Sequence, residues 1–340
     1  MTSSPFVVQR WFLCICWLLT VFQSAPTCFS LSTASSSSSE LKALVSKGLL
    51  VQPLPNLYVL GTIHIGSKSA DDVKSVLNTI QPSTVIVELP PSRLPTIVHS
   101  KKIMQQYSDK NDVNKQQDAS KPSKTSLIQA ITTLPSMAGA GLSFAGFPGM
   151  MVTVGLLWSS LVKQTWSLKN SQQQGNELKR RNEFEAAVAV ANILGASVVA
   201  ADWELEELVQ RLASSLTVFD WIRLMWGGLV LEPLGIQPID PLQRKPDESA
   251  VEWEERRRDI TTARASLKHA QTYTPAVDQV LVHGRNQHFA ELCLKQIYAQ
   301  VVTMKGEGSI DSNQLQPILC IVGLAHVDGV CEICQKQANI

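Results

Sequence analysis

The chain has 340 residues, of which 44% are hydrophobic and 17% charged, and its formal net charge is +1. A nearly neutral chain lacks the basic surface of nucleic-acid-binding proteins, so we expect no nucleic-acid partner. The apolar content also excludes a disordered protein. Because the charged fraction is below the quarter typical of globular domains, either the core is large or part of the chain contacts a membrane.

The first 40 residues differ from the rest of the chain. Arg10 is the only charged residue before Glu40, and an apolar run at 11–22 follows it. This run is shorter than the ~20 residues of a membrane-spanning helix. The pattern predicts a signal peptide, and a short membrane anchor that is retained stays the alternative.

A Ser-rich stretch without acidic residues, 29–39, follows the apolar run and has the composition of a transit peptide. A signal peptide followed by such a stretch resembles the bipartite leader of algae with secondary plastids. The expected destination is then the plastid, reached through the secretory pathway. The alternative is an endomembrane or extracellular protein with a flexible Ser-rich linker.

Four short apolar runs predict buried strands, at 57–60, 84–87, 197–201 and 318–322. Helical patterns lie between them at 69–80, 177–194, 204–213 and from 274 to about 301. Ser69 would open the first helix in a capping box, and Gly195 would end the second. Strands that alternate with helices predict an α/β fold with a mostly parallel central sheet and flanking helices.

Residues 41–340 are expected to form one domain that contains two unusual segments. Residues 100–124 are polar and predict a solvated loop, whereas residues 125–162 contain no charged residue and predict a helical apolar insertion. Five glycines and two prolines argue against one straight membrane span in this insertion. A membrane-embedded hairpin or span stays open beside a buried helical pair, which would cover the site or form a homo-oligomer interface.

Two matching turns are the sharpest chemical feature. Residues 61–64 and 323–326 both follow an apolar strand and read Gly-x-x-His. Glycine permits the tight turn, and histidine then lies at the carboxyl edge of the sheet, where α/β proteins bind ligands. Glu88 and Asp202 also follow strand ends, although Asp202 could instead cap the helix at 204. The four strand ends therefore predict a divalent-metal site.

These motifs resemble the TraB/PrgY family, which belongs with the Tiki, GumN and erythromycin-esterase-like proteins. The resemblance covers residues 55–332 and rests on the two Gly-x-x-His turns, the Val-Glu-Leu run at 87–89 with Arg93, and a middle block at 182–211. It implies an α/β fold with a metal-dependent hydrolase site, most concretely a metallopeptidase. It also implies Mn²⁺ or Co²⁺ in preference to Zn²⁺, and no His-Glu-x-x-His motif occurs.

The resemblance carries three sets of expected site residues. The expected metal ligands are His64, Glu88 and His326. The expected catalytic residues are Glu88, Glu183, Arg93 and Arg285. The expected substrate-binding residues are Arg211, Asn286 and Asp202.

Two positions depart from the family pattern. Gly284 stands where the family has a glutamate, and Trp203 stands where it has an arginine; His283 or His288 could substitute as ligand or base. Two functions therefore stay open. One is a metal-dependent hydrolase, a peptidase or esterase with a peptide or small-molecule substrate. The other is a non-catalytic, membrane-associated regulatory or peptide-binding protein.

Overall fold

The computed structural model describes residues 38–63, 68–99, 138–153, 183–226, 241–242, 248–306 and 315–338. The predicted signal peptide, most of the Ser-rich stretch, the loop at 100–124 and parts of the insertion at 125–162 lie outside these ranges. His64 also lies outside them, directly after the described end of a strand.

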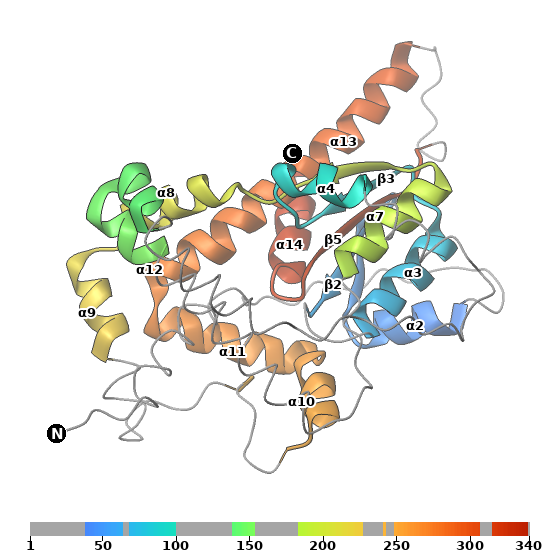
Figure 1. Ribbon diagram of the computed structural model, residues 1–340. Helices are drawn as coiled ribbons and strands as arrows, with labels where there is room; N and C mark the ends of the chain where they lie inside the picture. Colours follow the sequence, from blue (N-terminus) through green and yellow to red (C-terminus); the bar gives the residue numbers. More distant parts are fainter. Residues whose placement is uncertain are drawn as a thin grey trace.

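A five-stranded sheet with the order β1-β2-β5-β3-β4 forms the centre of the fold (Figure 1). Its strands are β1 (Leu50–Leu54), β2 (Leu57–Thr62), β3 (Thr84–Val87), β4 (Ser197–Ala200) and β5 (Ile318–Gly323). β1 is antiparallel to β2, and all other neighbouring strands are parallel. The predicted α/β class with a mostly parallel sheet is therefore confirmed.

Helices flank the sheet on both faces (Figure 1). The helices of the described chain include α2 (Ser38–Ser46), α3 (Lys68–Ile80), α4 (Leu94–Val98) after the 3-10 turn η1 (Pro91–Arg93), α7 (Glu183–Leu194), α8 (Leu205–Ser215), α9 (Val218–Trp226), α10 (Ala250–Arg257), α11 (Ile260–Tyr273), α12 (Pro275–Asp278), α13 (Arg285–Gly306) and α14 (Val327–Ala338). α3 and α7 pack together on one side, while α13 and α14 pack together on the other.

Burial on both faces of the sheet explains why apolar and polar residues do not alternate along the predicted strands. Every residue of β3 and β5 is buried, so neither strand has a polar side to show in the sequence. The edge strand β1 was not predicted, because Gln52 and Pro53 interrupt its apolar pattern. Proline is tolerated there because an edge strand leaves some backbone N–H groups without a partner strand.

The helix ends agree with the predictions only in part. Gly195 has φ +73°, as expected for a residue that ends a helix in the left-handed conformation. Ser69 lies inside α3, which begins at Lys68, and its hydroxyl accepts a hydrogen bond from the Ile63 N–H at 3.3 Å. The predicted capping role of Ser69 is therefore wrong, and the side chain instead ties the helix to the end of β2.

The predicted long helix after residue 274 is confirmed but is not regular. The helical run continues from Pro275 to Gly306, and a six-residue π-helical turn, η3 (Gln279–Gly284), separates α12 from α13. Single π-turns within α-helices occur frequently at functional sites. The turn ends directly before Arg285.

The four cysteines that follow the leader gather in the core. Cys293 on α13, Cys320 on β5, and Cys331 and Cys334 on α14 are all buried and free. The thiols of Cys320 and Cys334 interact with that of Cys293 and, together with burial, raise the pKa of Cys293 well above its usual value. Cys331 and Cys334 are thus packing residues of α14.

A second, smaller core lies beside the sheet. Trp203, Val209 and Leu281 form it with other side chains from α8 and the α12–η3 run, and Val152 joins it from the apolar insertion. Residues 138–153 are helical, which confirms the predicted helical character of this part of the insertion. Among the described residues, no helix is long and apolar enough to cross a membrane.

Candidate functional site

Three of the four predicted strand ends meet at one edge of the sheet. Glu88 follows β3 directly, Asp202 follows β4 by two residues, and His326 follows β5 by three. β3 is parallel to both β4 and β5, so these side chains emerge from the same edge. β2 reaches this edge too, because Thr62 pairs with Gly323, but its His64 lies outside the described residues.

Arg285 is the centre of this cluster. Its guanidinium donates to Glu88 Oε1 at 2.5 Å and to Asp202 Oδ1 at 3.0 Å, and its Nη1 lies 3.4 Å from His326 Nε2. Burial alone would lower the pKa of Arg285, but the negative charges of Glu88 and Asp202 outweigh that effect, so the pKa of Arg285 is raised. A single buried cation therefore binds two carboxylates and faces a histidine.

Both oxygens of Glu88 are engaged. Oε1 accepts from Arg285, and Oε2 accepts from the backbone N–H of Gly323 at 2.5 Å. The Asp202 carboxyl is less buried, and burial raises its pKa, with the charge of Glu88 adding to this rise and that of Arg285 opposing it. Asp202 does not cap α8, whose first turn follows Glu204, so the capping alternative for Asp202 is wrong.

His326 is completely buried, and a neighbour fixes its tautomer. Its Nδ1 lies 2.7 Å from Asn286 Oδ1. An amide oxygen only accepts, so Nδ1 must carry a proton and donate it. In the neutral ring, the lone pair is then on Nε2, which lies 3.8 Å from Glu88 Oε1. Asn286, expected to bind substrate, thus holds the imidazole of His326 in place.

Two glycines provide the room that this arrangement needs. A Cβ at Gly61 would lie 2.7 Å from side-chain atoms of both Leu324 and Val327, so the two Gly-x-x-His turns pack directly on each other. A Cβ at Gly329 would lie 2.0 Å from the Asn286 amide nitrogen. The sequence drew attention to Gly61 but not to Gly329, whose only signal is its place three residues after His326.

The two departures from the family pattern lie against each other. A Cβ at Gly284 would lie 2.9 Å from the Trp203 ring, so the indole fills the space that a larger side chain at 284 would need. Trp203 is buried, stacks under the Arg211 guanidinium at 4.2 Å, and lies 5.8 Å from the His288 ring. The small residue at 284 and the indole at 203 are therefore in direct contact.

The remaining expected residues lie around the cluster. Glu183 is buried at the start of α7, and Arg93 is exposed in η1, where its charge opposes the burial that raises the pKa of Glu185. Arg211 is half exposed on α8 and forms an ion pair with Glu207 at 2.6 Å.

No family model, no curated protein and no solved structure matches the chain. The function therefore has to be argued from the cluster itself.

The donor types at this edge fit a divalent metal, but the described residues do not complete a site. A carboxylate and an imidazole with its Nε2 lone pair directed inward are ordinary metal ligands, and Asn286 is the kind of partner that orients such a histidine. Within the described ranges, no group of three or more His, Cys, Asp or Glu is arranged to hold a metal ion. His64, the third expected ligand, lies outside those ranges.

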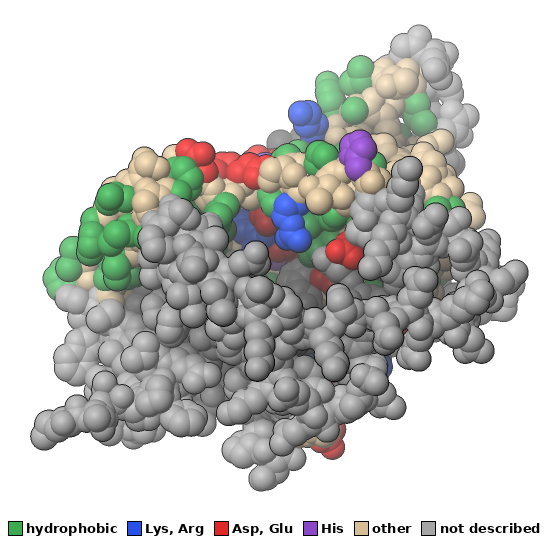
Figure 2. Space-filling model, in the orientation of Figure 1, with side chains coloured by type: hydrophobic (Ala, Val, Ile, Leu, Met, Phe, Trp, Pro, Cys, Tyr) green, Lys and Arg blue, Asp and Glu red, His purple; other side chains and the backbone are tan. Residues whose placement is uncertain are grey.

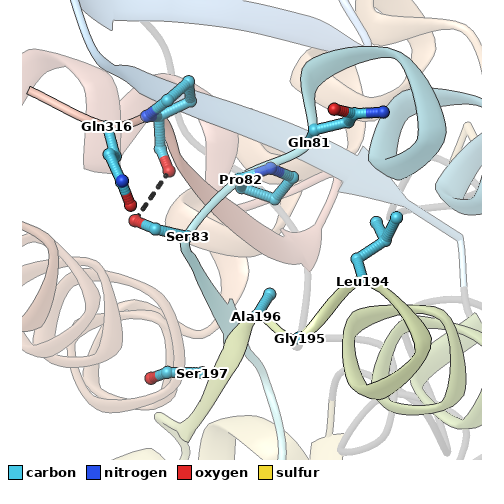
Figure 3. A pocket seen from close by; sticks show the side chains of 9 residues that line it. Gln81, Pro82, Ser83, Leu194, Gly195, Ala196, Ser197 and Gln316 are labelled. Carbon is cyan, nitrogen blue, oxygen red and sulfur yellow. Dashed lines mark hydrogen bonds between the residues drawn. The ribbon is translucent and has the colours of Figure 1, made fainter.

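The clearest cavity of the described chain lies at the opposite edge of the sheet. Its volume is about 590 Å³, and it lies at the amino ends of β3, β4 and β5 (Figure 3). Gln81, Ser83, Ser197 and Gln316 line it, and Ser83 donates to the Pro317 carbonyl oxygen at 3.4 Å. None of the described residues that line this cavity is ionisable.

Asp278 is a buried acid outside the cluster, and the sequence did not draw attention to it. Its Oδ1 has no hydrogen-bond partner, its Oδ2 lies 3.4 Å from His283 Nε2, and burial raises its pKa to about 7. The unfolded carboxyl ionises near its usual pKa of ~4. Between these values the folded protein holds a proton that the unfolded chain has lost, so stability falls as the pH rises.

We expect Asp278→Asn to reduce this pH dependence. At pH 8 the variant should be more stable than the parent by roughly 1–3 kcal/mol, because it removes an unpaired buried charge. At pH 4 the two proteins should differ little. Urea unfolding at both pH values measures the difference, and an equal effect at pH 4 and pH 8 would contradict the assignment of the raised pKa to Asp278.

Proposed function

We propose that the chain is a hydrolase whose reaction centre is the Glu88–Asp202–Arg285–His326 cluster. The observation that supports this most is the clustering of four ionisable side chains, three of them buried, from distant parts of the sequence at the carboxyl edge of the parallel strands. Buried charges are costly, and proteins that keep such groups together often use them in chemistry. The resemblance to the TraB/PrgY family agrees with this proposal.

Each residue of the cluster has a different role in the proposed hydrolysis. Because Nδ1 donates to Asn286, the lone pair of His326 is on Nε2, which faces Arg285 Nη1 at 3.4 Å. A proton or a cation that binds at Nε2 would replace this contact. Arg285 supplies a fixed positive charge near the point where a carbonyl oxygen would become negative. Asp202 is the most exposed member, with 21% of its side chain accessible, so a substrate would approach from its side.

Glu88 and His326, together with His64, are the residues that would hold a divalent metal. Such a metal, Mn²⁺ or Co²⁺ by the resemblance, would lower the pKa of a water molecule and polarise the substrate carbonyl. The substrate class follows from the same chemistry: a peptide bond or a small ester or amide.

The test is hydrolysis of a panel of peptides and small esters by the purified chain in the presence of Mn²⁺ or Co²⁺. We expect His326→Gln and Glu88→Gln each to lower kcat/KM by about 10²–10⁴-fold, the usual contribution of a positioned acid or base. His269→Gln is the matched control, because the His269 ring packs against Tyr273 within α11. Unchanged turnover in His326→Gln would contradict the proposal, provided that circular dichroism shows a folded protein.

One observation favours a second candidate, a non-catalytic peptide-binding protein. Arg285 already binds both carboxylates, and both oxygens of Glu88 are occupied, so the cluster can serve a purely structural role. Elemental analysis separates the two candidates. A chain that retains about one equivalent of Mn²⁺ or Co²⁺, and loses it in His326→Gln, supports the hydrolase. A metal-free chain that still binds peptides supports the second candidate.

A further inference from the structure

The apolar insertion folds back on itself in its described part. Residues 138–153 are helical, but Gly146 has φ +63°, and a Cβ at Gly149 would lie 2.3 Å from the Gly141 carbonyl oxygen. In one straight helix these two glycines would be ~12 Å apart. The contact therefore shows a short helical hairpin, with its turn at Gly146 and its two arms touching backbone to backbone.

One side of this hairpin is packed and the other is bare. Val152 is buried in the second core, and Phe144 packs against that core. Leu142, Phe147 and Met151 are 50%, 64% and 37% exposed. Figure 2 shows hydrophobic side chains on the left of the molecule, where Figure 1 places the hairpin. The hairpin thus presents a bare apolar side, with Phe147 next to the turn.

A second apolar surface begins at α9. Val218 and Phe219 are 72% and 82% exposed, while Trp221 on the same helix packs against the second core that also holds Val152. The hairpin and α9 are therefore anchored on the same small core and both expose large apolar side chains. Scattered single exposures are ordinary, but several on neighbouring helices indicate an interaction surface.

The charge pattern of the insertion indicates what covers this surface. The hairpin belongs to a run of 38 residues, 125–162, without Asp, Glu, Lys, Arg or His. A protein interface normally has a polar rim around its apolar centre, whereas the acyl region just below the headgroups of a bilayer accepts apolar side chains and disfavours charged ones. The arms are too short for the ~20 residues of a spanning helix.

We propose that the exposed side of the 138–153 hairpin docks on the surface of a neutral lipid bilayer. Leu142, Phe147 and Met151 enter the headgroup–acyl boundary, and the second core holds the hairpin at a fixed place on the domain. Because the insertion carries no charge, the attraction is apolar and does not depend on anionic lipids. The hairpin lies in the interface and does not cross the membrane.

Flotation of the full chain with phosphatidylcholine vesicles tests this proposal. We expect the chain to float with the vesicles equally at low and high NaCl, because apolar burial is not screened by salt. The triple variant Leu142→Ser, Phe147→Ser, Met151→Ser should lower the partition coefficient at least about tenfold, which corresponds to the loss of one or more buried apolar side chains.

The matched control is Tyr298→Ser with Val302→Ser. These residues on α13 are 71% and 50% exposed, so the control removes comparable apolar surface elsewhere on the protein. Thermal unfolding checks that both variants fold. Failure of the parent to float, or equal loss in the control, would overturn the proposal. A dimer in light scattering that the triple variant abolishes would overturn it too, because the occupant would then be a second copy of the chain.

Discussion

Replacing Arg285 with methionine is expected to destabilise the protein by about 3–5 kcal/mol, the usual cost of removing one partner from a buried ion pair. The guanidinium is 5% exposed and is the shared partner of Glu88 and Asp202. Without it, the buried carboxylate of Glu88 and the partly buried carboxylate of Asp202 have no cation between them. Urea unfolding at neutral pH measures the loss of free energy.

Two further variants separate charge from shape. Lys336→Met is the control, because its ion pair with Glu332 is exposed and should contribute less than about 1 kcal/mol. Adding Glu88→Gln to Arg285→Met removes one of the unpaired charges and should restore part of the stability. An Arg285→Met variant as stable as the Lys336→Met control would show that the cluster does not hold the sheet edge together.

A methyl group at Gly329 is expected to have the opposite effect from a usual glycine-to-alanine change in a helix. In an open helix this change stabilises by up to about 1 kcal/mol. Gly329→Ala should instead destabilise by about 1–3 kcal/mol, because the new Cβ would overlap the Asn286 amide. Gly139→Ala is the matched control, since nothing lies within 4 Å of a Cβ at that helical glycine.

A double-mutant cycle tests whether Asn286 is the obstacle. Asn286→Ala removes the amide that the new Cβ would meet, so Gly329→Ala should cost little in that background. Both single variants should also disturb the tautomer of His326, which nitrogen NMR of the imidazole reports. Additive losses of stability, with an unchanged imidazole spectrum, would contradict a positioning role for Gly329.

The sheet could be predicted from the sequence because each buried strand is a short run of consecutive apolar residues. β3 and β5 are short apolar runs, and their burial on both faces leaves an unbroken hydrophobic pattern. A residue that follows such a run must lie at the edge of the sheet. Glu88, Asp202 and His326 could therefore be assigned to one edge before any contact was known.

The contacts within the cluster could not be predicted, because they join positions that the sequence does not relate. Arg285 is 197 residues from Glu88, and no local pattern shows that one guanidinium bridges two strand ends. The sequence also does not show that Asn286 contacts His326, so Asn286 was expected to bind substrate. The need for glycine at 329 depends on a side chain 43 positions away, and the sequence alone does not show that approach.

Because of the π-helical turn η3, the two parts of one continuous helical run face different parts of the protein. Before it, Val277 and Asp278 face the small core and His283; after it, Arg285 and Asn286 face the sheet edge. Loss of one residue from the turn would rotate α13 by ~100° relative to α12. Either the second core or the buried cluster would then lose its partners, so the length of this turn is constrained as strictly as the identity of any side chain beside it.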